Sequence, residues 1–224
     1  MEERNAAYRG LSEGVDAEAV ARDAVLATQP RRVLEVGCGT GEFAVSLRDA
    51  GIAEVVALDI SPRMVEIATA RGVDARVGDV ERLPFGDSEF DCVVAAWMLY
   101  HVPHLDVALS ELARVVTAHG CLVACTNAND TRPDELDRLL QMSPDAGYTF
   151  SSENGRTMLL EHFERVDRTD CPFTLVFPDH QALRRYVAAL PTRGHMAADV
   201  PAFEGEFRRS GRLTVFVAHQ PKPR

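Results

Sequence analysis

The sequence lacks the features that mark membrane-spanning, secreted and disulfide-stabilised proteins. Its longest unbroken apolar run, from Cys92 to Tyr100, has about half of the length that a helix needs to cross a bilayer. The N-terminal segment contains no apolar stretch, so we expect no secretory signal peptide. The five cysteines are odd in number and none belongs to a C-x-x-C pair, so we expect no disulfide framework. These absences favour a reduced, cytoplasmic protein without a membrane span.

Basic charge is also scarce. The chain has 24 basic and 34 acidic residues, which gives a net charge of -10. Proteins that bind nucleic acids need basic surfaces, because contacts with phosphate supply most of their affinity. The local arginine pairs, at 31–32, 184–185 and 208–209, are isolated from one another. We therefore expect no nucleic acid among the partners.

The composition that remains is that of an ordinary globular protein. Of the 224 residues, 46% are hydrophobic and 26% are charged, and the 15 glycines and 12 prolines exclude a collagen-like or low-complexity chain. The length suits one domain, since single domains reach about 200–250 residues. Because no internal repeat or clear boundary is visible, we predict a single domain over 1–224.

Short apolar strands alternate with helical segments through the first 126 residues. The pattern predicts strands at 31–36, 54–60, 74–77, 90–96 and 121–126. It predicts helices at 15–28, 42–50, 62–70 and 105–117, with Gly120 as the end signal of the last helix. Such alternation is typical of right-handed βαβ units, so we expect an α/β fold with a parallel sheet between helices.

The remainder of the chain has a looser pattern. It contains predicted helices at 132–142, 153–163 and 180–190, and predicted strands at 166–177 and 212–219. The stretch 191–211 has no clear period. We therefore expect an insertion, over 178–211, before the last strand.

A glycine turn follows the first predicted strand and carries the strongest signal for a ligand. Val33 to Gly41 reads as a strand, a G-x-G-x-G turn and a helix start, where free N–H groups can receive an anion. Glu35 precedes the turn, and Asp59 ends the next strand, where a carboxylate can accept hydrogen bonds from ribose hydroxyls. The alternative is that Asp59 only caps the helix that starts near Ser61.

Five ordered motifs then carry a family resemblance. They are VLEVGCGTGEF at 33–43, LDIS at 58–61, VGDVERLPFGDSEFD at 77–91, VVAAWMLYHV at 93–102 and SELARVV at 110–116. Together they resemble class I S-adenosylmethionine-dependent methyltransferases, with the closest likeness to the ubiquinone and menaquinone (type 11 domain) branch. The resemblance implies a Rossmann-like sheet of seven strands, mostly parallel, with the last strand antiparallel and helices on both faces.

The resemblance also implies a division of the domain and a set of cofactor contacts. Residues 1–29 would form a helical lid region, 30–126 the cofactor-binding core, and 127–224 the substrate side. The residues implied for S-adenosylmethionine are Glu35, Gly37, Cys38, Gly39 and Gly41 at its methionine end, Asp59 at the ribose, Ile60, Met64, Asp79 and Val80 at the adenine, and Ala96 and Trp97 beside the amino-acid moiety. The alternative to a cofactor contact is that Asp79 only forms a turn and that the side chain of Cys38 only packs in the core.

The implied reaction is methyl transfer to an O, N or C nucleophile of a small organic metabolite, in secondary metabolism, with S-adenosylhomocysteine as product. His101 is the candidate base or substrate contact, with a structural histidine as the alternative. Pro103 breaks the helix that would align His101 with His104, so we expect no metal there. Tyr8 is a candidate lid residue, and we expect a monomer or homodimer.

Two other readings stay open. A cofactor-binding scaffold or regulator without turnover would share every cofactor residue named above. A nicotinamide-dependent or flavin-dependent oxidoreductase has a related topology, but the G-x-G-x-G spacing and the Gly78-Asp79-Val80 turn speak against it.

Overall fold

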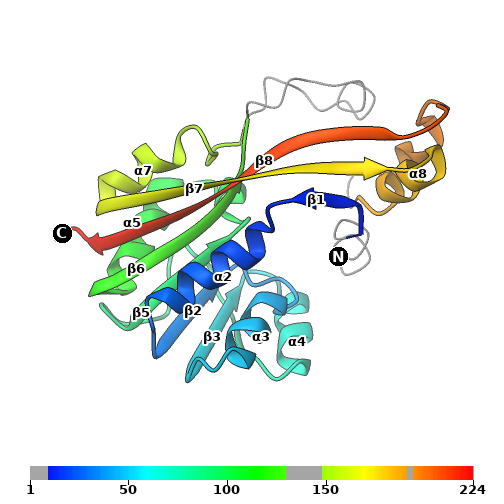
Figure 1. Cartoon of the computed structure of the whole chain (residues 1–224). Coiled ribbons are helices and arrows are strands. Elements are labelled where there is room, and N and C mark those ends of the chain that lie inside the picture. The colour runs from blue at the N-terminus through cyan, green and yellow to red at the C-terminus, as the bar shows by residue number, and fades with distance from the viewer. Residues whose placement is uncertain (1–9, 130–147, 191–193, 224) are drawn as a thin grey trace. The chain divides into compact units, whose positions relative to one another are not determined.

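A computed structural model describes residues 10–129, 148–190 and 194–223 (Figure 1). The chain divides into two compact units. The larger unit comprises 16–129, 148–170 and 213–224, and the smaller unit comprises the described residues of 1–15 and 171–212. The predicted helix at 132–142 and Tyr8 lie outside the described residues, and the single-domain assignment stays a prediction.

The larger unit contains the predicted alternation of strands and helices. In chain order its elements are α2 (Ala17–Ala27), β2 (Arg32–Val36), α3 (Glu42–Asp49), β3 (Glu54–Asp59), α4 (Pro62–Ala70), β4 (Asp74–Val77), β5 (Phe90–Ala96), the 3-10 turn η1 (Leu99–His101), α5 (Leu105–Val115), β6 (Val116–Asn127) and α7 (Gly155–His162). It also holds parts of β7 (Phe163–Phe177) and β8 (Phe207–Pro221). The side chains of Asp16 and Ser61 cap the starts of α2 and α4, whereas α3, α5 and α7 begin without a side-chain cap.

The sheet confirms the expected α/β fold. The strands are hydrogen-bonded in the order β1-β7-β8-β6-β5-β2-β3-β4. The neighbours from β6 through β5, β2 and β3 to β4 pair in parallel, while β8 pairs antiparallel with β6. The carboxyl ends of the parallel strands therefore meet at one edge of the sheet, the edge at which α/β proteins bind ligands.

The strand count and some boundaries differ from the prediction. The described residues hold eight strands rather than seven, because Ser12–Gly14 forms a short β1 that pairs antiparallel with β7 at Leu175 and Phe173. Three residues are too few to give a strand signal in the sequence. β7 also begins three residues before the prediction, at Phe163, and β8 is longer at both ends.

Gly120 was predicted to end a helix, but it lies inside β6. Helix α5 ends at Val115, and β6 begins at once with Val116. The register with β5 shifts between Phe90 and Cys92. A Cβ atom on residue 120 would lie 2.6 Å from the carbonyl oxygen of Asp91. The glycine is needed for this close approach of two strands, which sequence periodicity does not reveal.

Helices cover the two faces of the larger unit's sheet with different packing. Along β3, Val56 and Leu58 belong to a large cluster that includes the buried face of α5. Ala57, between them, belongs to a cluster of small side chains from α3 and α4. Because successive strand residues point to opposite faces, the two clusters lie on opposite sides of the sheet. Figure 1 shows α3 and α4 on one side and α5 on the other.

The smaller unit has a hydrophobic cluster of its own. It contains β1, α8 (His180–Ala188) and η2 (Gly194–Asp199), together with parts of β7 and β8. Phe177 packs edge-on against Tyr186 at 5.3 Å between ring centroids, and Phe203 lies 5.8 Å from Phe207. Part of the predicted insertion is therefore ordered helix and strand. No helix in the described part of the chain is long and apolar enough to cross a membrane.

The buried face of α5 gives a test of this fold. We expect Leu112→Ala to lower the free energy of unfolding by about 2–5 kcal/mol, because the fully buried side chain leaves a cavity. Val107→Ala is the matched control on the same helix. Val107 is 46% exposed, so this change should stay within about 0.5 kcal/mol. Urea denaturation measures both, and equal losses would contradict the assignment of the buried face.

Candidate functional site

The glycine turn after β2 has the backbone that its sequence predicts. Gly37, Gly39 and Gly41 have φ values of 66°, 54° and 78°, in the left-handed region that favours glycine. Space is also limited. A Cβ atom on residue 37 would lie 2.8 Å from the Cβ of Met98, and one on residue 41 would lie 2.8 Å from the Cβ of Ala68. Both backbone and packing therefore require glycine here.

Asp59 holds this turn in place. Its Oδ2 accepts a hydrogen bond from the Gly39 N–H at 2.8 Å, and its Oδ1 accepts one from the Ser61 N–H at 2.9 Å. The side chain is 8% exposed. The helix cap itself is Ser61, whose hydroxyl accepts from the Met64 N–H. A carboxylate has about four lone-pair sites, so Asp59 keeps capacity for further donors such as ribose hydroxyls.

Glu35 is a buried carboxyl group directly beneath the glycine turn. It is 3% exposed, and its Oε2 has no hydrogen-bond partner among the described residues. The carboxyl also interacts with the N–H of Ala44 in the first turn of α3, where the N-cap residue Gly41 offers no side chain. Burial raises the pKa of Glu35 to about 8, and nearby Asp59 adds to this shift, while the Ala44 N–H opposes it.

Cys38 is the only side chain between the first two glycines. Burial, together with the negative charges of Glu35 and Asp59, raises the pKa of its thiol to about 12. The thiol therefore stays protonated at neutral pH. The side chain belongs to the small-residue cluster around Ala44 and Ala57. These observations favour packing over nucleophilic chemistry for Cys38, as the sequence suggested.

Of the predicted adenine residues, Ile60, Asp79 and Val80 follow β3 and β4, and Met64 lies in the first turn of α4. Ile60 is 70% exposed, Met64 is half-buried, and Val80 is buried. Asp79 is exposed, and its Oδ1 accepts from the Glu81 N–H at 2.9 Å. One carboxyl oxygen of Asp79 therefore stabilises the turn, as in the turn-forming alternative. The sequence did not single out Val77, a 54% exposed residue that pairs with Asp59 in the sheet.

The chain after β5 passes the glycine turn in a strained conformation. Trp97 has a φ of 54°, which costs a non-glycine residue roughly 1–2 kcal/mol. Its N–H donates to the Cys125 oxygen at 3.0 Å, which helps to hold this geometry. Strain of this kind is frequent at functional sites. Ala96 and Trp97 are half-buried, and the next residue, Met98, forms the wall against Gly37 that the sequence did not reveal.

His101 ends η1 and packs against Tyr100. Its ring is 4.5 Å from that of Tyr100, which is 4.8 Å from the ring of Tyr148. The His101 side chain is exposed and has no hydrogen-bond partner in the described part of the chain. His104, by contrast, bonds to Glu81 through Nδ1 at 2.9 Å. The two histidines therefore have different surroundings.

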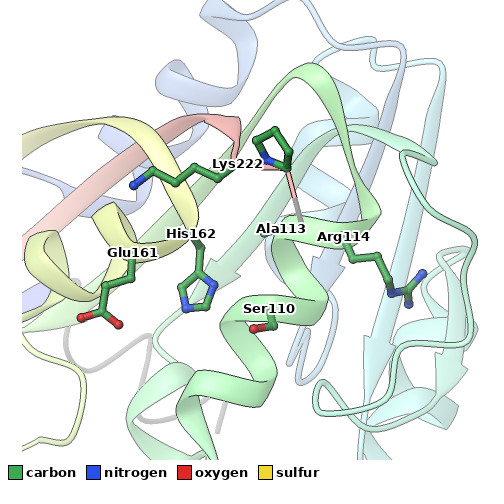
Figure 2. Close-up of a pocket in the computed structure, with 7 residues that line it drawn as sticks. Ser110, Ala113, Arg114, Glu161, His162 and Lys222 are labelled. Carbon is green, nitrogen blue, oxygen red and sulfur yellow. The ribbon is translucent and has the colours of Figure 1, made fainter.

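Folding thus brings the predicted residues together at the carboxyl ends of β2, β3, β4 and β5, all within the larger unit. The hollow in Figure 2 is a different feature. It has a volume of about 210 Å³ and lies between α5, the end of α7 and the segment at Lys222, away from the glycine turn. The arrangement at the carboxyl edge offers a glycine cradle, two acidic groups and exposed apolar surface to one ligand.

Comparisons with known proteins give a family match over this part of the chain. Residues 34–124 match the family model described as methyltransferase domain. A demethylmenaquinone methyltransferase of Deinococcus radiodurans is 38% identical over 125 residues, which cover 51% of this chain and 52% of that protein. The chain thus spans about half the length of the curated relatives that it matches.

Solved structures extend the likeness of the fold beyond that half. The YcgJ protein of Bacillus subtilis superposes with a TM-score of 0.65 at 17% identity, over 92% of this chain and 100% of that chain. An S-adenosylmethionine-dependent methyltransferase of Thermotoga maritima gives 0.60 at 24% identity, over 91% and 89%. These likenesses confirm the Rossmann-like fold, while the sequence match is confined to the half that carries the candidate site.

The buried Glu35 predicts a dependence of stability on pH. Its pKa is higher in the folded chain than the ordinary 4.5, so the folded state holds the proton more tightly. Stability should then fall as pH rises from about 4.5 to about 8, by at most about 1.4 kcal/mol for each pH unit. Glu35→Gln removes this contribution, because glutamine is neutral and of similar shape.

Urea denaturation of both proteins between pH 5 and pH 8 measures the effect. The control is Glu66→Gln, which changes an exposed carboxylate on α4 and should leave the slope as in the parent. If the unfolding free energy of Glu35→Gln changed with pH as steeply as that of the parent, the pKa of Glu35 would not be raised in the folded chain, and the prediction would be wrong.

Proposed function

We propose that this chain, whose residues 34–124 match the methyltransferase domain model, is a class I S-adenosylmethionine-dependent methyltransferase that binds S-adenosylmethionine and methylates a small organic acceptor. The observation that carries the proposal is the junction of β2 and β3. There, three left-handed glycines form a turn in which the Gly39 N–H donates to the Asp59 carboxylate. A buried Glu35 oxygen nearby has no hydrogen-bond partner within the described part of the chain. Binding and activity are both proposals, since the matched region is about half of the chain.

The residues present fit this cofactor. A buried oxygen without a hydrogen bond lowers stability by about 1–3 kcal/mol. A hydrogen bond from the methionine ammonium group to Glu35 Oε2 would remove this cost. Asp59 has lone pairs left for the ribose. The exposed side chain of Ile60, together with Met64, offers an apolar contact for the adenine face. Asp79 would accept its amino group, and the Val80 N–H would face a ring nitrogen.

The cofactor supplies, when bound, a methyl group activated by a neighbouring sulfonium charge. The chain's own contribution is to position the acceptor near attack distance and to exclude water, which is worth several kcal/mol. Ala96, Trp97 and Met98 form a fixed backbone beside the glycine turn. A base is needed only where the acceptor nucleophile carries a proton, and His101 would take that proton on an imidazole nitrogen.

The acceptor side favours a planar substrate. Tyr100, which follows β5, packs against the rings of both His101 and Tyr148. Asn129 holds the Tyr148 backbone through two hydrogen bonds, of 2.8 and 3.3 Å. Flat aromatic surfaces suit flat ligands. The relatives include demethylmenaquinone methyltransferases, and the family-model match ends at residue 124, before Tyr148.

Cofactor binding is the first test. Isothermal titration calorimetry should detect S-adenosylmethionine and S-adenosylhomocysteine at one molecule per chain. Asp59→Asn should weaken both by about ten-fold or more, because the ribose loses a charged acceptor. Ile60→Ala should weaken binding by a few-fold and leave stability nearly unchanged, since Ile60 is 70% exposed. The control is Asp49→Asn on the exposed end of α3, and no uptake by the parent would refute the proposal.

Turnover is the second test. The parent is mixed with isotope-labelled S-adenosylmethionine and an extract of small metabolites, and mass spectrometry identifies any product that gains a methyl group. His101→Ala should reduce the turnover of that acceptor about 100-fold or more if His101 is the base, with unchanged cofactor affinity. The control is His119→Ala, an exposed histidine at the amino end of β6. Binding without any methylated product would instead support the scaffold reading.

A further inference from the structure

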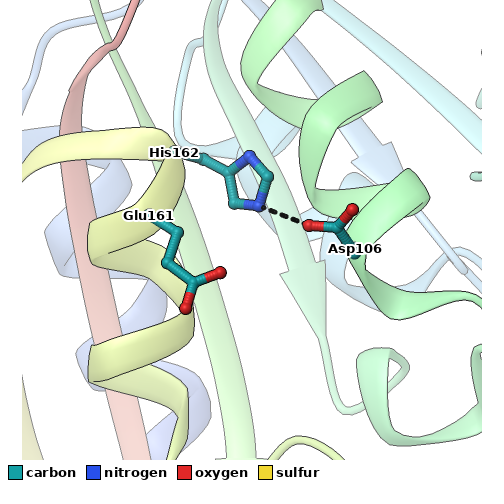
Figure 3. Close-up of side chains that lie close together, drawn as sticks. All are labelled: Asp106, Glu161 and His162. Carbon is teal, nitrogen blue, oxygen red and sulfur yellow. Dashed lines mark ion pairs between the residues drawn. The ribbon is translucent and has the colours of Figure 1, made fainter.

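Three potential metal ligands converge outside the candidate cofactor site. Asp106 comes from the first turn of α5, and Glu161 and His162 end α7 (Figure 3). One ligand atom from each lies within 4.8 Å of the other two. The residues are far apart in the sequence, so only the packing of α5 against α7 brings them together.

The buried Nε2 of His162 has an ion-pair contact but no hydrogen bond among the described residues. The His162 side chain as a whole is 15% exposed. Its Nε2 atom lies 3.3 Å from Asp106 Oδ1, close enough for an ion pair but without the direction of a hydrogen bond. A buried nitrogen of this kind is costly to leave unsatisfied.

The separation suits two ligands of one ion. Zn²⁺ binds histidine nitrogen and carboxylate oxygen at about 2.0–2.2 Å in a tetrahedral arrangement, which puts neighbouring ligand atoms about 3.4 Å apart. Nε2 of His162 and Oδ1 of Asp106 have nearly this distance. Glu161 is exposed and Asp106 is 83% exposed, so both carboxylates can rotate to complete the geometry.

The surroundings of these three residues leave space for an ion and its water ligands, and the nearby cationic groups are bonded elsewhere. The Lys222 N–H donates to the His162 oxygen at 2.8 Å, which fixes the end of α7. The Lys222 ammonium donates to the Leu160 oxygen at 2.7 Å, while Arg114 bonds to Glu111 and Asp87. The hollow of about 210 Å³ in Figure 2 borders Glu161 and His162 and can hold water as the remaining ligand. Two carboxylates balance the charge of a divalent ion.

We propose that Asp106, Glu161 and His162 form a site for a divalent transition metal, with Zn²⁺ as its best-matched ion. One imidazole and two carboxylates suit Zn²⁺ better than Mg²⁺ or Ca²⁺, which prefer oxygen ligands alone. The ion links α5 to α7 and so stabilises the fold. None of its ligands belongs to the candidate cofactor site, so the proposal is independent of the methyltransferase function.

Zinc binding to the full chain tests the proposal. The protein is stripped of metal with a chelator and titrated with ZnCl₂ by calorimetry, with the melting temperature measured alongside. We expect one Zn²⁺ per chain and a higher melting temperature. His162→Gln and Asp106→Asn should each weaken binding at least ten-fold and lose the thermal shift, because each removes a ligand while keeping the shape of the side chain.

A matched control separates this site from an ordinary histidine–carboxylate pair. His219 Nε2 lies 3.1 Å from Asp167 Oδ2 in a hydrogen bond and belongs to no such cluster among the described residues, so His219→Gln should bind Zn²⁺ as the parent does. Co²⁺ serves as a spectroscopic probe, and its absorption should lack a thiolate band despite the five buried cysteines. Absence of binding, a thiolate band, or parent-like affinity in both ligand variants would overturn the proposal. If His162→Gln does not fold, the Zn²⁺ affinity of Asp106→Asn tests the proposal alone, because the Asp106 side chain is 83% exposed and its replacement should not disturb folding.

Discussion

The carboxylate of Asp59 is the contact on which the geometry of the candidate site depends. One oxygen receives the Gly39 N–H and the other the Ser61 N–H, so a single side chain joins the turn after β2 to the start of α4. Both donors belong to backbone that would otherwise lack a partner in a partly buried place. Because hydrogen bonds to a charged group are stronger than neutral ones, this bridge fixes the position of the left-handed glycines. The same group keeps acceptor capacity for a ligand.

Glu35 shows how one residue can serve both folding and binding. Gly41 at the start of α3 has no side chain to cap the helix, and the buried carboxyl beneath it reaches the Ala44 N–H instead. A larger residue at 41 would collide with Ala68, so the cap must come from the strand. The cost is a carboxyl group in an apolar place next to Asp59. A cationic ligand group at the unpartnered oxygen would offset this cost by favouring the ionised form.

The proposed cofactor residues lie in one part of the chain. The matched region, 34–124, contains every residue proposed to bind the cofactor. The smaller unit has a hydrophobic cluster of its own and lies outside the matched region. Acceptor recognition is placed on such variable segments in many α/β proteins, because the scaffold does not depend on them. The acceptor proposed for this chain is therefore expected to contact the part of the chain that lies outside the family match.

The sequence by itself determined the βαβ alternation, the position of the glycine turn and the candidate residues at the strand ends. These features are local, since periodicity, caps and glycine spacing act over a few residues. Only the tertiary structure decided the role of Gly120 between strands, the pairing of β1, the wall that Met98 forms against Gly37, and the meeting of Asp106 with His162. Each of these depends on segments far apart in the chain. Contacts between such segments are set by how the helices and strands pack, and one-dimensional spacing carries no record of them.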